Sequence, residues 1–179
     1  MSDGLRRIII TGGPGSGKST LLDVLNKKGF STSIEAGRAI IQDQVLIGGN
    51  ALPWGDRQAF AELMLSWELR SWHAAKMCNG PFFFDRGIPD IAGYLSLCHL
   101  SVPEHLVKAI GLFRYNDTVF ITPPWREIFK QDSERKQSFQ EAELTYHTMT
   151  ATYQHHGYRL IELPLSTAEE RAEFVLSNL

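Results

Sequence analysis

The 179-residue sequence contains few cysteines and no long hydrophobic run. Its two cysteines, Cys78 and Cys98, form no C-x-x-C pair, which is typical of proteins from a reducing compartment. No apolar stretch approaches the ~20 residues that a membrane-spanning helix needs. The apolar residues after Arg6 and Arg7 are too few for the core of a signal peptide. We therefore expect a cytoplasmic protein without a membrane segment.

The sequence also lacks a strong charge of either sign. Its net charge of -2 gives no broad basic field, so we expect neither nucleic acid nor a membrane surface as a general partner. The six histidines form no metal-binding motif. The hydrophobic fraction of 43% and the charged fraction of 21% are typical of a globular protein. The length suits one domain over residues 1–179.

Secondary-structure patterns alternate along the chain. Five apolar or β-branched segments predict strands, at 5–10, 31–35, 82–85, 117–122 and 158–163. Helix-forming segments lie between or after them, at 17–27, 37–47, 56–77, 89–99, 103–113, 139–156 and 166–179, with 125–136 helical in part. This alternation predicts an α/β fold of three layers, in which a five-stranded parallel sheet carries helices on both faces. Ligands of such sheets bind at the carboxyl ends of the strands.

The strongest motif lies between the first strand and the first helix. Residues 12–19 match G-x-x-x-x-G-K-[ST], the P-loop pattern, in the strand–helix context that the motif requires. Glycines let the backbone approach a polyphosphate closely, and the helix start adds its positive dipole end. Lys18 can reach the β- and γ-phosphates, and the Ser19 hydroxyl can bind Mg²⁺. The expected ATP-binding residues are Gly12, Gly13, Pro14, Gly15, Ser16, Gly17, Lys18, Ser19 and Thr20.

A carboxylate follows the apolar strand 82–84. Asp85 is expected at the ligand edge of the sheet, where it would bind Mg²⁺ together with Ser19. The alternative is an aspartate that caps the next helix. Arg86 follows it, whereas hydrolytic ATPases of the AAA+ kind usually place a water-activating glutamate there. The D-x-x-G match at 90–93 lies beyond the strand, and no N-K-x-D motif is present, so a G-protein switch is not expected.

Three segments, 11–20, 35–38 and 84–87, carry a resemblance to a known group. The chain resembles the small P-loop kinases of nucleosides and nucleotides. It is similar in particular to AAA-domain ATPases related to the nicotinamide riboside kinase domain. The resemblance implies phosphoryl transfer from ATP, with Glu35 as the base or as a contact to the acceptor hydroxyl. It implies that Arg38 holds the acceptor. Arg86 is a further candidate for binding the acceptor.

A surface pair at the start of a helix is the alternative for Glu35 and Arg38. Asp85 is a second candidate for the base. The segment 125–136 resembles a mobile lid that supplies arginines to the transferred phosphoryl group, with Arg135 slightly ahead of Arg126. The alternative for this segment is a solvated charged helix face.

Aromatic residues gather before the third strand. Phe60, Leu63, Met64 and Trp67 recur at the spacing of one helix face, which favours core packing over a ligand pocket. Trp54 follows Pro53 outside that periodic stretch and is the expected pocket residue for the acceptor. The loop 164–167 follows the fifth strand, where the resemblance places adenine.

Together these features predict a Mg²⁺-dependent kinase that transfers the γ-phosphoryl group of ATP to a small metabolite such as a nucleoside or nucleotide. An ATPase that acts on a partner, a non-catalytic nucleotide-binding regulator and a nucleic-acid end kinase are the alternatives. The sequence leaves the acceptor and the oligomeric state open.

Overall fold

A computed structural model describes residues 6–130 and 137–179 of the chain. Its centre is a five-stranded parallel sheet with the order β2-β3-β1-β4-β5. The strands are β1 (Arg6–Gly12), β2 (Ser31–Thr32), β3 (Pro81–Asp85), β4 (Thr118–Thr122) and β5 (Arg159–Glu162). The predicted sheet is therefore confirmed. Strand β2 is shorter than expected, because the chain turns after Ser33 into the helix that begins at Ala36.

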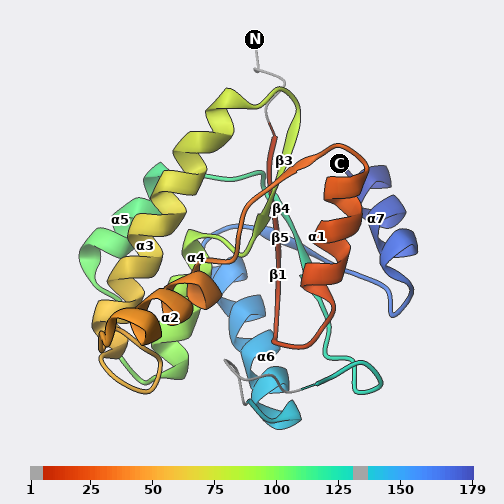
Figure 1. Cartoon of the computed structure of the whole chain (residues 1–179). Helices are drawn as coiled ribbons and strands as arrows, with labels where there is room; N and C mark the ends of the chain where they lie inside the picture. The colour runs from red at the N-terminus through yellow and green to blue at the C-terminus, as the bar shows by residue number, and fades with distance from the viewer. Residues whose placement is uncertain (1–5, 131–136) are drawn as a thin grey trace.

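Seven α-helices and one short 3-10 helix appear within the described residues (Figure 1). They are α1 (Lys18–Lys27), α2 (Ala36–Ile47), α3 (Arg57–Ala74), η1 (Ala75–Met77), α4 (Ile88–Leu97), α5 (Glu104–Leu112), α6 (Phe139–His155) and α7 (Ala168–Ser177). None of these helices is long and apolar enough to cross a lipid bilayer.

Two details differ from the sequence predictions. Residues 125–130 form turns instead of the expected helix, because hydrogen bonds from Ile128 to Trp125 and from Phe129 to Arg126 close tight i+3 turns. For the last helix, the sequence predicts Ser166 or Thr167 as the cap with Glu169 as its capping-box partner, whereas α7 is capped by Thr167 with Glu170 as the partner.

Both faces of the sheet are buried. Ile8, Ile10 and Phe83 pack with residues of α1 and α7 on one face. Ile9 and Phe84, their neighbours along the strands, pack on the other face with residues of α3, α4, α5 and α6. Figure 1 shows these two helical layers on opposite sides of the sheet. Continuous apolar strands are the expected sequence for a parallel sheet that is covered twice.

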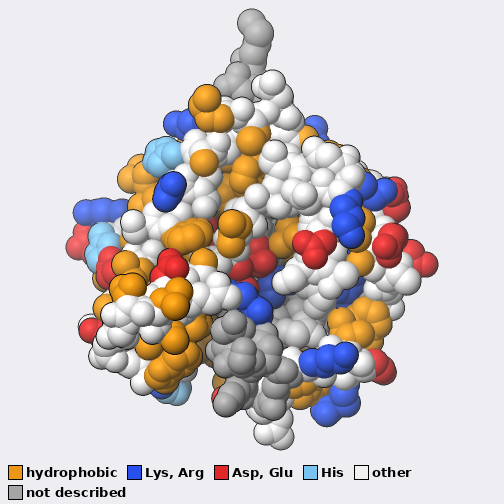
Figure 2. All heavy atoms as spheres, in the orientation of Figure 1, with side chains coloured by type: hydrophobic (Ala, Val, Ile, Leu, Met, Phe, Trp, Pro, Cys, Tyr) orange, Lys and Arg blue, Asp and Glu red, His pale blue; other side chains and the backbone are white. Residues whose placement is uncertain are grey.

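The carboxyl ends of β1 and β3 and the start of α1 meet at one edge of the sheet. Strand β1 pairs with β3 through Ile10 and Asp85, the last residue of β3. Figure 2 shows acidic and basic side chains together in a hollow near the centre of the face between α1 and α2. The fold therefore collects its polar side chains where ligands of parallel sheets bind.

Candidate functional site

Two glycines of the loop between β1 and α1 adopt a left-handed backbone conformation. Gly15 and Gly17 have φ angles of 67° and 89°, in the left-handed region. A Cβ on Gly15 would lie 2.7 Å from the Phe129 ring, and a Cβ on Gly17 would lie 2.9 Å from the Arg171 guanidinium. The Ser16 hydroxyl holds the loop from inside through the Gly13 carbonyl at 2.7 Å. Other side chains therefore pack so closely against this turn that a side chain on Gly15 or Gly17 would not fit.

A cavity of about 440 Å³ opens over this loop. Lys18 is only 6% exposed and donates from Nζ to the Gly13 carbonyl at 3.2 Å, so its ammonium lies folded over the loop. Ser19 and Thr20 are exposed in the same cavity. Backbone N–H groups, a helix start and an ammonium group suit a polyphosphate ligand.

Arg171 connects the far wall of this cavity to the loop. It is 2% exposed, and it donates to the Pro164 and Ser16 carbonyls at 2.7 Å each. Its guanidinium lies 5.0 Å from the centre of the Trp125 ring. Burial lowers the pKa of Arg171. Arg171 therefore connects the loop 164–167, which was expected to lie beside adenine, to the phosphate loop. The position of Arg171 within an amphipathic helix did not indicate this role.

Two side chains with oxygen atoms of the kind that bind Mg²⁺, those of Asp85 and Ser19, lie at the same edge of the sheet. Asp85 is 5% exposed at the end of β3, and its backbone N–H donates to the Ser33 hydroxyl at 2.9 Å. The cap of the following helix is Gly87, so the alternative role of Asp85 as a helix cap is wrong. A carboxylate and the Ser19 hydroxyl are hard oxygen ligands, which fit Mg²⁺ bound jointly with phosphate oxygens.

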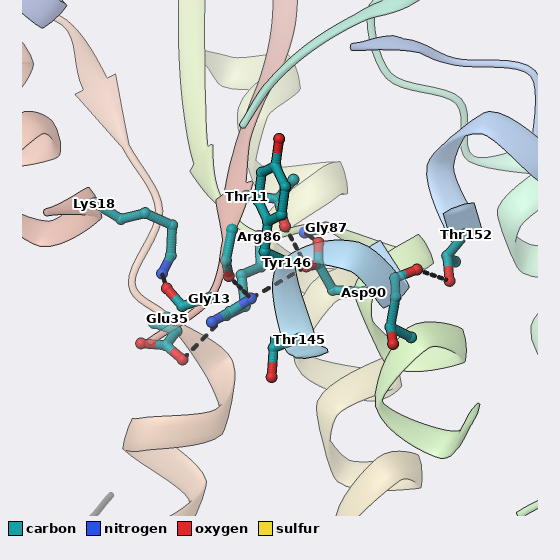
Figure 3. A network of polar contacts seen from close by, with 12 residues as sticks. Thr11, Gly13, Lys18, Glu35, Arg86, Gly87, Asp90, Thr145, Tyr146 and Thr152 are labelled. Atoms are coloured by element: carbon teal, nitrogen blue, oxygen red, sulfur yellow. Dashed lines mark hydrogen bonds and ion pairs between the residues drawn. The ribbon is translucent and has the colours of Figure 1, made fainter. Parts of the chain in front are cut away.

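Arg86 occupies a strained position between two carboxylates. Its φ of 67° is unusual for a residue other than glycine. Its Nε lies 3.4 Å from Glu35, and its Nη1 lies 3.3 Å from Asp90 and donates to the Gly12 carbonyl at 2.8 Å (Figure 3). Burial lowers the pKa of Arg86, but the adjacent carboxylates together raise it by a larger amount, so the net shift of this pKa is upward. The guanidinium thus stays charged and fixes Glu35 beside the phosphate loop.

Asp90 stabilises the arrangement of Arg86 and Glu35. Its carboxylate accepts hydrogen bonds from the Thr11 hydroxyl at 2.5 Å, from the Gly87 N–H at 2.8 Å and from the Tyr153 hydroxyl. It is 5% exposed. Strand β1 and helices α4 and α6 are therefore joined at one side chain. The sequence pattern D-x-x-G marked Asp90 but did not reveal this role.

Asp90→Ala is expected to reduce the free energy of unfolding by about 3–5 kcal/mol, because it leaves the buried Arg86 charge with one carboxylate fewer. Urea denaturation measures this loss. Glu104→Ala is the matched control, since it removes an exposed i,i+4 pair with Lys108. The control is expected to cost less than about 1 kcal/mol. Equal losses in the two variants would contradict the role of Asp90.

A second cavity, of about 250 Å³, adjoins the first. Its apolar lining comes from α2, α3, α4 and α6 and from the loop before α3. Glu35, Pro14 and Gln137 line both cavities. Trp54 lines the second cavity and is 61% exposed, so it lies at the rim. The two spaces therefore meet beside the phosphate loop.

Glu68 is a buried polar residue of this cavity that the sequence pattern did not mark as a site residue. It follows Phe60 and Met64 at spacings of four residues on α3, and all three side chains line the cavity. The expected helix face is rotated accordingly: Leu63 is 38% exposed, whereas Glu68 is 3% exposed. Burial, and then the carboxylates Asp90, Asp85 and Glu35, raise the pKa of Glu68 well above its usual value. The four-residue spacing was the available signal.

The predicted arginines Arg38 and Arg126 do not line the second cavity. Arg38 lines the phosphate-loop cavity and not the second cavity. Arg126 stacks on Phe139, with its guanidinium 4.0 Å from the ring centre, and Lys130 instead lines the cavity over the loop. Arg135 falls outside the described residues.

Comparisons with known proteins identify the family and the fold. The model of the family described as an AAA domain matches residues 7–171. No curated protein matches the sequence.

Solved structures of several other proteins share the fold. Deoxyadenosine kinase from M. mycoides has a TM-score of 0.67 at 14% identity, with 96% of this chain and 97% of that chain covered. The NadR protein in complex with NR has a TM-score of 0.66 at 15% identity, with 96% of this chain but 49% of that chain covered. Thymidylate kinase from Ehrlichia chaffeensis has a TM-score of 0.61 at 15% identity, with 98% of both chains covered. The expected kinase-like fold is therefore confirmed.

Proposed function

Since the chain belongs to this AAA-domain family and carries its phosphate loop beside a second cavity, we propose that it is an ATP-dependent phosphotransferase. It binds ATP over the loop and transfers the γ-phosphoryl group to a hydroxyl of a small molecule in the second cavity. The observation that carries the proposal is the position of Glu35, which lines both cavities where they meet.

The phosphate-loop residues 12–20 hold the donor. Backbone N–H groups bind the phosphates, and Lys18 moves from the Gly13 carbonyl to the β- and γ-phosphates. Ser19 and Asp85 hold Mg²⁺, which when bound neutralises charge on the phosphate oxygens. Trp125 and Arg171 line the wall of the cavity that adjoins residues 164–167, where we place the base.

Glu35 is the base in this mechanism. The acceptor oxygen forms a bond to the γ-phosphorus, its proton passes to the Glu35 carboxylate, and the bond from that phosphorus to the β,γ-bridging oxygen breaks to release ADP. Arg86 orients Glu35 through their contact at 3.4 Å. The burial of Asp85 at the strand end supports its assignment to the metal and not to the acceptor.

Relatives in structure support a nucleoside or nucleotide acceptor. One is a deoxyadenosine kinase, another binds NR, and a third is a thymidylate kinase. The apolar lining of the second cavity, which includes Phe60 and Tyr94, suits a planar ring.

ADP formation across a panel of nucleosides, nucleotides, vitamins and sugars tests the proposal. We expect ADP to form faster with particular acceptors, and Asp85→Asn to suppress that gain. ADP formation at the same rate with every acceptor would contradict the proposal in favour of an ATPase that acts on a partner. The absence of ADP with all acceptors, despite ATP binding, would contradict it in favour of a non-catalytic regulator.

A further inference from the structure

The second cavity contains a feature that the transfer chemistry does not use. Resting on the function proposed above, we propose that Glu68 is the specificity-determining residue of the acceptor cavity. It selects an acceptor whose planar heterocycle carries a neighbouring hydrogen-bond donor and acceptor, and the cavity disfavours acceptors that bear a phosphate group. The acceptor is accordingly a nucleoside and not a nucleoside monophosphate.

The Glu68 carboxyl is buried and, within the described part of the chain, lacks a partner for one of its oxygens. Its Oε2 atom is inaccessible to solvent and has no hydrogen-bond partner among residues 6–130 and 137–179. Buried polar atoms are rarely left without a partner in a folded protein. The side chain lines the second cavity on the same helix face as Phe60 and Met64. A ligand in that cavity would provide the partner.

The surroundings of the Glu68 carboxyl group act on its protonation. Desolvation raises the pKa of Glu68, and the charges of Asp90, Asp85 and Glu35 raise it further, whereas Arg86 lowers it. The protonated form is thereby favoured. A neutral carboxyl presents an O–H donor beside a C=O acceptor, which is complementary to the hydrogen-bonding edge of a nucleobase.

Aromatic and aliphatic side chains form an apolar wall around the cavity. Phe60 and Tyr94 meet edge to face with their ring centres 5.4 Å apart, and both line the cavity. Ile91 and Met64 line it as well, and Trp54 lies at its rim. Such a wall stabilises a flat ring by apolar and aromatic contact.

The charges around the cavity disfavour an anionic acceptor. Apart from Glu68, three of the described lining residues carry carboxyl groups and one carries a guanidinium: Glu35, Asp90, Glu141 and Arg86. The guanidinium is already engaged by Glu35 and Asp90. A phosphate on the acceptor would therefore meet carboxylates without a free cation of the described lining to offset them, which disfavours monophosphates.

Steady-state kinetics with the common ribonucleosides and deoxyribonucleosides, and with their 5′-monophosphates, tests this inference. The wild-type chain is expected to favour nucleosides over their monophosphates by at least about 10²-fold in kcat/KM. Glu68→Gln keeps a donor beside an acceptor and should stay within about 10-fold of wild type. Glu68→Leu should lose about 10²-fold or more, mostly as a higher acceptor KM, with the KM for ATP unchanged.

Glu62→Leu is the matched control, because Glu62 lies on the same helix with its side chain 54% exposed. It should leave the acceptor KM unchanged. Circular dichroism and thermal melting check that each variant folds. Should Glu68→Leu not fold, calorimetric binding of nucleosides to Glu68→Met replaces it, with the same expected loss of affinity.

Two results would overturn the inference. One is an equal acceptor KM in wild type, Glu68→Gln and Glu68→Leu. The other is a wild-type preference for monophosphates. Failure of the proposed function looks different, since the wild-type chain itself would phosphorylate no acceptor. In that case, calorimetric binding of nucleosides to wild type and to Glu68→Leu still decides whether Glu68 contributes to nucleoside binding.

Discussion

Lys18→Ala is expected to lower kcat/KM for ATP by at least about 10²–10³-fold, the effect of removing one preorganised charge donor from a developing phosphoryl charge. Lys18 is nearly buried, starts α1 and lies over the Gly13 carbonyl. Its ammonium therefore needs only a small displacement to reach a bound polyphosphate. ADP formation at saturating acceptor concentration measures the effect.

Lys27→Ala is the matched control for this experiment. Lys27 is the last residue of the same helix and is exposed, so its loss should leave the rate within about twofold of wild type. ATP turnover that is unchanged in Lys18→Ala would refute the assignment of the phosphate loop as the donor site.

Glu35→Gln is expected to lower kcat by about 10²–10⁴-fold, while ATP still binds with an affinity near that of wild type. The amide keeps the size of the side chain but cannot accept the proton of the acceptor hydroxyl. It also weakens the contact to Arg86, which the carboxylate now holds at 3.4 Å. Single-turnover kinetics, together with calorimetric binding of an ATP analogue, separate the chemical step from binding.

Asp85→Asn provides the comparison that assigns the two carboxylates. It should raise the Mg²⁺ concentration needed for half-maximal rate, whereas Glu35→Gln should leave that concentration unchanged. The reverse pattern, with Mg²⁺ dependence altered only in Glu35→Gln, would exchange the two roles.

Local features of the sequence predicted the framework well, because each depended on neighbouring residues. The run Ile8–Ile10 and the run Phe82–Phe84 are buried on both faces and formed strands as expected. The glycines of residues 12–17 required a strand–helix turn, and the structure contains one. Alternation of these elements was sufficient to predict the parallel sheet.

Features that depend on distant packing were harder to predict. Glu68 lines the second cavity only because α3 packs against α4, and a lone glutamate on a helix usually faces solvent. Arg171 reaches Ser16 across 155 residues of sequence. Residues 125–130 contain helix-forming side chains, yet Phe129 packs over Gly15 and beside Phe139, and turns replaced the helix. Tertiary contacts decided all three cases.

The fate of the γ-phosphoryl group tests the central claim most directly. The wild-type chain would be incubated with Mg²⁺, γ-labelled ATP and the acceptor that most increases ADP formation. The products would then be separated and identified by mass. We predict that the label appears on a hydroxyl oxygen of the acceptor in amounts equal to the ADP formed. Recovery of all the label as inorganic phosphate, whatever acceptor is present, would contradict the account.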